Sequence, residues 1–166
     1  MLLIKKRHPV STKEIKEILE RASRIAPKLP ETIDKKKGLE VVELDSGEKV
    51  YLQEKRPVLI ELEGKLMPAL TASEGVLSEI PRIVVDMGAV PYICNGADVM
   101  APGIRSVPEG VKPGDVVAVA DERHNKVLAV GVLAMERERI LNREKGKAVK
   151  NVHHVGDEIW KNMLKI

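Results

Sequence analysis

The spacing of apolar side chains predicts a helix near the start of the chain. Residues 11–26 carry an apolar side chain at every third or fourth position, the repeat of a helix with one buried face: Ile15, Ile18, Leu19, Ala22 and Ile25. Ser11 and Glu14 match a capping box at its start, and Pro27 and Pro30 interrupt the pattern at its end. We therefore expect one amphipathic helix over residues 11–26.

Short apolar runs with turn residues between them predict two hairpins in the first 80 residues. The expected strand pairs are 41–44 with 49–52, and 58–62 with 65–66. A short helix is expected between residues 71 and 78. Together with the amphipathic helix, these elements predict a small α/β domain over residues 1–80.

Strand patterns dominate from Pro81 onward. The expected strands are 83–86, 116–120, 127–135 and 152–154, with a short helix over 137–143. Turns rich in proline, glycine and asparagine separate these elements, and short strands with such punctuation are typical of a small barrel. Residues 81–166 are therefore predicted to form a second, β-rich domain.

A glycine-containing corner follows the first strand of this second domain. An apolar run that we interpret as strand ends at Asn95-Gly96, and a mixed segment then stops at Pro102-Gly103. Glycine lets the backbone approach a ligand closely, so main-chain N–H groups at such a corner can meet a phosphate or a sugar. The alternative is that these glycines only terminate strands.

Basic side chains are concentrated in one part of the chain. The net charge is +3, and residues 1–80 are close to neutral, with 15 Lys and Arg against 14 Asp and Glu. Residues 137–150 hold six basic and two acidic side chains, which indicates either an acidic partner or a solvated surface. The chain has one Trp, two Tyr and no Phe, which argues against a platform on which bases stack.

The sequence contains no recognisable catalytic or metal-binding motif. No phosphate-binding glycine motif is present, and His153 and His154 are adjacent, so on a strand they would face opposite sides. Cys94 is the only cysteine, and we interpret it as a buried, inert thiol. Asp86 is interpreted as a turn residue and Asp98 as the start of a helix. We expect no enzymatic activity, no cofactor and no bound metal.

Composition also predicts where the protein works. No apolar run approaches the roughly 20 residues of a membrane span, and charged residues follow the first apolar ones, the reverse of a signal peptide. With a single cysteine, these features predict a cytoplasmic protein without membrane contact. Lys and Glu are abundant while Gln53 is the only glutamine, a usage that favours a thermophilic archaeon as the source.

Several segments resemble one family. The V-D-x-G-A segment at 85–89 and the N-G-A-D-V-M-A-P-G-I segment at 95–104 resemble the PUA domain, the RNA-binding module of pseudouridine synthases and archaeosine transglycosylases. Residues 112–119 and 127–135 look like two strands of that domain. The closing segment 146–160 resembles the malignant T-cell-amplified protein family and its archaeal homologues, in which a further N-terminal domain precedes the PUA domain.

The resemblance implies both a fold and a function. The fold would be α+β, with a small N-terminal α/β (pre-PUA) domain over 1–80 and a β-rich PUA pseudo-barrel over 81–166. The function would be that of a non-catalytic, translation-related factor that binds structured RNA, either tRNA or small-subunit rRNA, with a SUI1-domain protein as partner. The RNA-binding residues would be the corner and three nearby cations that neutralise phosphates: Gly96, Ala97, Asp98, Val99, Met100, Ala101, Pro102, Gly103, Ile104, Arg105, Lys147 and Lys150.

The same residues allow other interpretations. At least one of Val99 and Met100 is expected in the core rather than in contact with RNA. The chain could instead be a detached RNA-specificity subunit of an RNA-modifying enzyme of the archaeosine transglycosylase or pseudouridine synthase type. It could also be a protein-interaction adaptor that does not touch RNA. An N-terminal domain like that of the malignant T-cell-amplified relatives would favour translation.

Overall fold

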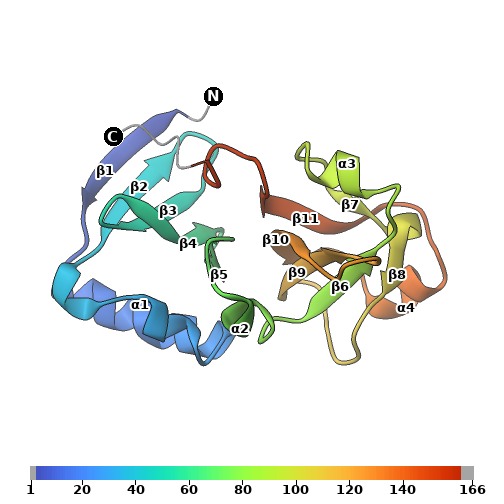
Figure 1. Ribbon diagram of the computed structural model, residues 1–166, viewed down its shortest axis with the longest axis horizontal. Helices are drawn as coiled ribbons and strands as arrows, with labels where there is room; N and C mark the ends of the chain where they lie inside the picture. Colours follow the sequence, from blue (N-terminus) through green and yellow to red (C-terminus); the bar gives the residue numbers. More distant parts are fainter. Residues whose placement is uncertain (1–2, 162–166) are drawn as a thin grey trace. The chain divides into compact units, whose positions relative to one another are not determined.

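A computed structural model describes residues 3–161, which divide into two units (Figure 1). The first unit comprises residues up to 79 together with 158–161, and the second comprises residues 80–157. The sequence-based division instead assigns 158–166 to the second domain, and residues 162–166 lie outside the described part of the chain. No helix within residues 3–161 is both long enough and apolar enough to cross a membrane.

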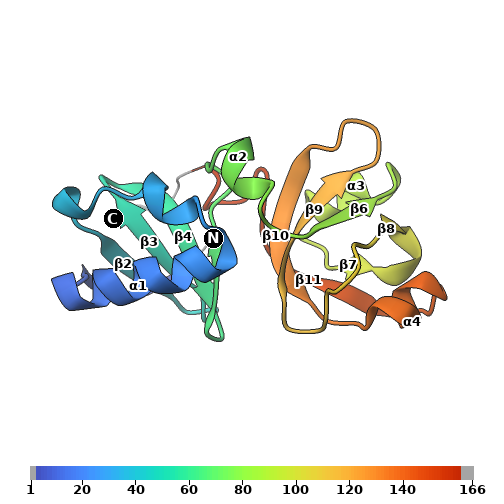
Figure 2. The same ribbon diagram turned by 90° about the horizontal axis from the view of Figure 1, so that it is seen from below.

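The first unit is an antiparallel sheet with one long helix along it (Figures 1 and 2). The strands follow one another in sequence order across the sheet: β1 (Ile4–Pro9), β2 (Glu40–Leu44), β3 (Lys49–Gln53), β4 (Arg56–Leu62) and β5 (Lys65–Pro68). The helices are α1 (Thr12–Ile25), the 3-10 turns η1 (Leu29–Thr32) and η2 (Lys35–Lys37), and α2 (Glu74–Leu77). Both predicted hairpins and the short helix are confirmed.

Ser11 caps the start of α1 as predicted, whereas the Glu14 carboxylate bonds the Ser11 hydroxyl instead of the backbone N–H that a capping box uses. The Ser11 hydroxyl accepts a hydrogen bond from the backbone N–H of Glu14 at 3.1 Å and donates one to the Glu14 carboxylate. Four of the five predicted stripe residues are buried: Ile15, Ile18, Leu19 and Ala22. Ile25 at the helix end is partly exposed. The apolar stripe therefore holds α1 against the rest of its unit.

The first strand was not predicted from the sequence. All six residues of β1 are exposed, so the segment lacks the alternation by which a half-buried strand is recognised. It forms because its backbone pairs with β2, from His8 opposite Val41 to Ile4 opposite Leu44. A pairing across more than 30 residues leaves no local signal in the sequence.

The second unit is a curled six-stranded sheet in the order β7-β11-β10-β9-β6-β8. The strands are β6 (Arg82–Val85), β7 (Val99–Met100), β8 (Ile104–Ser106), β9 (Val116–Asp121), β10 (Val127–Leu133) and β11 (Lys147–His154). Short helical segments connect them: α3 (Val90–Ile93), η3 (Ala101–Gly103) and α4 (Arg137–Leu141). The predicted strands at 83–86, 116–120 and 127–135 and the helix at 137–143 are confirmed, whereas the last strand begins at Lys147 instead of residue 152.

The connection between β7 and β8 forces the sheet to curl. These two strands lie at opposite edges of the sheet, and only the three residues of η3 separate them in the chain. Five strand spacings would place the edges of a flat sheet about 24 Å apart, but four Cα steps from Met100 to Ile104 reach at most about 15 Å. The sheet must therefore bend round until its two edges approach, which produces the predicted α+β fold with a pseudo-barrel.

The wall of this pseudo-barrel contains one very close backbone approach. At Gly131 on β10, the neighbouring β11 departs from regular register between the pairs Val130–His153 and Gly131–Asn151. A Cβ atom added to Gly131 would overlap the carbonyl oxygen of Lys150 and lie 3.0 Å from its carbonyl carbon. Glycine is therefore required here for space, since the obstacle is backbone and cannot rotate away.

We predict that Gly131→Ala destabilises the second unit by about 3 kcal/mol, because β10 and β11 must separate to admit the methyl group. Chemical denaturation followed by circular dichroism measures the change. Gly75→Ala is the control, because its Cβ would lie 3.6 Å from the Ser73 hydroxyl, an ordinary contact within α2. Wild-type stability of the Gly131 variant would show that the two strands are not held this closely.

Candidate nucleic-acid interface

A hollow of about 420 Å³ opens on the second unit at the predicted corner. One wall is the segment that follows β6, including Gly88, Ala89 and Tyr92. The other wall runs from Ala97 to Gly103, through β7 and η3. The backbone N–H of Asp86 donates to the carbonyl of Gly103 at 2.9 Å and joins the two walls. The corner is therefore one side of a real concavity.

The wall after β6 is a helical turn, which corrects the sequence interpretation. The apolar run up to Cys94 was interpreted as strand, but Val90–Ile93 form α3. Asp86 starts this turn, because its carboxylate accepts a hydrogen bond from the backbone N–H of Ala89 at 2.9 Å. The interpretation of Asp86 as a turn residue is confirmed. A single helical turn gives too few residues for a helical repeat to be recognised.

Gly103 provides the space at the centre of the hollow. Its φ is not positive, so glycine is not required there by backbone conformation. A Cβ at Gly103 would lie 3.4 Å from the Cβ of Ala89 on the facing wall. Gly96 differs, because it has a φ of +95° and turns the chain back after α3. Small residues on both walls therefore keep the backbone accessible.

Asn151 on β11 fixes the loop between α3 and β7. Its side-chain amide donates to the carbonyls of Ile93 and Ala97, at 3.0 Å each. Its backbone N–H donates to the carboxylate of Asp98 at 2.9 Å. Asp98 was predicted to start a helix, and this is wrong, since it precedes β7 and anchors the loop to β11 instead. The shape of one wall thus depends on contacts to a single strand.

The structure divides the predicted site residues into three groups. Six line the hollow: Ala97, Asp98, Val99, Met100, Pro102 and Gly103. Ala101 and Ile104 are buried in the core, and Val99 is only 2% exposed although it reaches the hollow. The expectation that one of Val99 and Met100 belongs to the core is confirmed, because Met100 is 50% exposed. Gly96 is exposed at the turn but does not line the hollow.

Tyr92 is a site residue that sequence reasoning missed. It lines the hollow and is 70% exposed, more than any other large hydrophobic residue described. The scarcity of aromatic residues argued against stacking, but one exposed ring in the right place suffices to stack one base. The available signal was its position, between the V-D-x-G-A segment and Asn95-Gly96. Gly88 and Ala89 also line the hollow, and the sequence analysis used them only as part of the V-D-x-G-A resemblance.

The three predicted cations are placed differently. Lys147 pairs with Met100 across the β7–β11 ladder, and its ammonium lies 3.7 Å from the Asp98 carboxylate at the hollow. Lys150 is exposed on the same strand. Arg105 does not line the hollow, and its guanidinium instead forms an ion pair with Glu122 at 3.0 Å. Lys147 is therefore the predicted cation best placed to meet a phosphate in the hollow.

Cys94 and the adjacent histidines His153 and His154 do not line the hollow. Partial burial raises the pKa of the Cys94 thiol, so less of the reactive thiolate is present at neutral pH. His153 is buried, with Nδ1 2.8 Å from the Asp157 carboxylate, whereas His154 is partly exposed. Within residues 3–161, no three His, Cys, Asp or Glu side chains gather as they would around a metal ion.

Two family models match the chain. The model described as the PUA domain matches residues 81–155, which include the hollow and the whole curled sheet. The model described as a domain of unknown function (DUF1947) matches residues 6–72 in the first unit. The second unit is thus a PUA domain, and the chain is a PUA-domain protein with a preceding domain.

The chain is similar over nearly its whole length to an uncharacterized protein of Methanocaldococcus jannaschii, MJ1432, with 39% identity over 95% of this chain and 96% of that protein. It is 31% identical to translation machinery-associated protein 20 of Eremothecium gossypii, over 81% of this chain and 80% of that protein. Malignant T-cell-amplified sequence 1 of Rattus norvegicus is 28% identical, over 87% of this chain and 81% of that protein.

A solved structure agrees with these relatives. The crystal structure of hypothetical protein PH0734.1 from Pyrococcus horikoshii matches with a TM-score of 0.75 and 36% identity, over 94% of this chain and 98% of that one. The chain belongs to the family of translation machinery-associated protein 20 and malignant T-cell-amplified sequence 1, together with their archaeal relatives. The predicted resemblance is confirmed.

We predict that Asn151→Ala destabilises the second unit by about 1–3 kcal/mol, because the carbonyls of Ile93 and Ala97 lose their amide donor. The same variant should speed hydrogen exchange in the loop from Gly96 to Asp98. Thermal melting and exchange mass spectrometry measure the two effects. Asn142→Ala, an exposed position at the end of α4, is the control and should change stability by less than about 0.5 kcal/mol. Equal stability of both variants would contradict the anchoring role of Asn151.

Proposed function

We propose that this protein binds structured RNA through the hollow of its PUA domain and acts in translation, on tRNA or on the small ribosomal subunit. The observation that carries this proposal is the hollow itself. It opens where the family resemblance places the RNA site, and small residues, one exposed aromatic ring and a cation surround it.

The lining suits an unpaired nucleotide at the end or in a loop of a folded RNA. The ring of Tyr92 offers a face on which a base stacks, and Met100 provides a second exposed apolar surface. Gly103 and Gly88 let the sugar and the backbone come close. Lys147 would bind a neighbouring phosphate, in competition with Asp98. Recognition of this kind reads shape and one base rather than a long sequence.

The match to translation-associated relatives favours translation over the other two functions. Proteins named for translation match about four fifths of the chain, so the similarity includes most of the first unit as well as the PUA domain. A detached specificity subunit of an RNA-modifying enzyme would need to share only the PUA domain. A SUI1-domain protein as partner and a cytoplasmic location follow from the same family assignment and remain predictions.

We predict that Tyr92→Ala weakens binding of a folded tRNA about 5- to 100-fold, through loss of base stacking. Tyr92→Phe keeps the ring and should bind like the wild type. Ala97→Trp should also weaken binding, because its side chain would fill the hollow. Fluorescence anisotropy with labelled tRNA measures the affinities, after melting curves have established that each variant is folded. Wild-type affinity of both Tyr92→Ala and Ala97→Trp would place the RNA on another face.

Removal of a lysine should change the salt dependence of binding, unlike the variants at Tyr92 and Ala97. Lys147→Ala and Lys150→Ala should each reduce the slope of log affinity against log salt by about 0.7–0.9, because one phosphate contact is lost. The variants at Tyr92 and Ala97 should leave that slope unchanged. Lys112→Ala is the control, an exposed lysine on the loop before β9. Affinity that is independent of salt in the wild type would favour the protein-interaction adaptor.

A further inference from the structure

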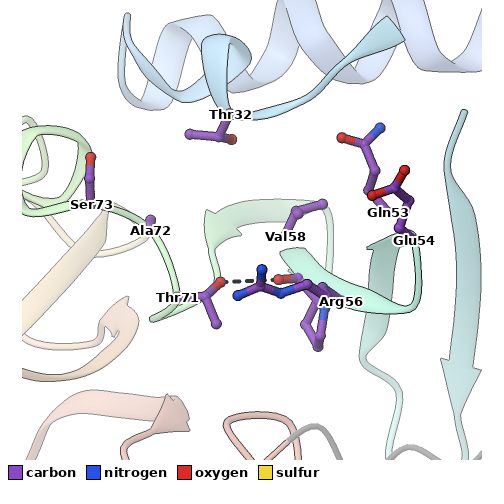
Figure 3. A pocket seen from close by; sticks show the side chains of 9 residues that line it. Thr32, Gln53, Glu54, Arg56, Val58, Thr71, Ala72 and Ser73 are labelled. Carbon is purple, nitrogen blue, oxygen red and sulfur yellow. Dashed lines mark hydrogen bonds between the residues drawn. The ribbon is translucent and has the colours of Figure 1, made fainter. Parts of the chain in front are cut away.

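A second cavity, of about 300 Å³, lies entirely within the first unit (Figure 3). Its walls come from the end of β3, the start of β4, η1 and the segment between β5 and α2. Figure 3 shows Arg56 and Thr71 on one side, with Thr32 opposite and Gln53 and Glu54 at the strand end. This part of the chain belongs to the domain of unknown function, so the family match assigns the cavity no ligand.

Arg56 gives this cavity a positive charge that no carboxylate of the lining neutralises. The only carboxylate in the lining is that of Glu54, and it already pairs with Lys37 on η2 at 3.3 Å. The guanidinium of Arg56 is exposed and makes no ion pair or hydrogen bond with any side chain in residues 3–161. Its five N–H donors therefore remain available to an anion.

Further positive charge is held close to the cavity by Gln53. The Gln53 amide donates to the carbonyls of Asp34 and Gly38, at 2.8 and 2.9 Å, and accepts from the N–H of Asp34 at 2.9 Å. These three bonds fasten the lysine-rich turn η2 to a residue of the lining. Lys35 and Lys36 on that turn are exposed. The turn therefore adds more positive than negative charge beside the cavity, three lysines against Asp34, which favours anions.

Two of the three hydroxyl groups in the lining, those of Thr71 and Thr32, indicate what else the ligand carries. Thr71 donates its hydroxyl proton to the carbonyl of Pro57 at 3.1 Å, and Thr32 donates to the carbonyl of Leu29 at 2.7 Å. Both oxygens are then left only as acceptors for a ligand. A matching ligand combines an anionic group for Arg56 with hydroxyl or amino donors for these oxygens. Inorganic phosphate carries a P–OH donor at neutral pH, but it has no apolar part to meet Pro57 and Val58 of the lining.

We propose that this cavity binds a phosphorylated ribose, with the phosphate on Arg56 and the sugar hydroxyls or base amino group on Thr32 and Thr71. Pro57 and Val58 provide an apolar surface for the rest of the nucleotide. A free nucleotide and a nucleotide unit within an RNA both present this chemistry. The site is separate from the hollow of the PUA domain and does not depend on RNA binding there.

The test is a titration of the isotope-labelled full-length protein, followed by amide chemical shifts in NMR. Adenosine monophosphate should shift the amides of Gln53, Arg56 and Thr71, and adenosine, which lacks the phosphate, should shift them at least about tenfold less at equal concentration. Arg56→Gln should weaken nucleotide binding about tenfold or more. Arg24→Gln, which removes an exposed arginine of α1 that pairs with Glu20, is the matched control and should bind like the wild type.

A short oligoribonucleotide as second probe distinguishes the two sources of the ligand. Much tighter binding of the oligonucleotide than of the mononucleotide at these amides would identify RNA as the ligand. Equal or weaker binding would identify a free nucleotide. The proposal is overturned if neither probe shifts these amides, or if Arg56→Gln binds both probes like the wild type. Either of those results would leave the hollow of the PUA domain unaffected, because Arg56 lies outside that domain.

Discussion

The shape of the candidate RNA site depends on how β11 is held between its two neighbours. On one side β11 approaches β10 so closely at Gly131 that no side chain fits there. On the other side Asn151 and its backbone N–H bind three groups of the loop that forms the hollow, on Ile93, Ala97 and Asp98. A shift of β11 would therefore be transmitted directly to the surface on which RNA is proposed to bind.

The same geometry explains why small residues face each other across part of the site. The sheet closes where β7 and β8 are joined by the three residues of η3, and a Cβ added to Gly103 there would lie 3.4 Å from the Cβ of Ala89. Gly103 sits at this closure, opposite Ala89 and hydrogen-bonded to Asp86. Steric requirements of the fold and accessibility to a ligand thus favour the same residues. Any larger side chain at this closure would have to fit the fold sterically and still leave the site accessible to a ligand.

The sequence predicted those helices and strands that are marked by patterns within a few neighbouring residues. The capping box and the apolar stripe defined α1, and turn residues defined the hairpins of the first unit. β1 and α3 were missed, since β1 depends on distant pairing and α3 is a single turn within an apolar run that resembles a strand. The corner was located from its turn residues, and the family resemblance gave it a role in RNA binding. The burial of Ala101 and Ile104 and the exposure of Tyr92 depend instead on how the sheet curls. The composition gives the number of aromatic rings in the chain, whereas the fold decides which of them face solvent.

Ultraviolet crosslinking of the protein to a bound, folded tRNA, followed by mass spectrometry of the modified peptides, would locate the RNA on the protein surface. The hollow predicts crosslinks at Tyr92 or Met100, because these are the large hydrophobic side chains that both line it and are exposed. Crosslinks confined to residues outside both 86–103 and β11 would contradict the proposal that RNA binds at this site.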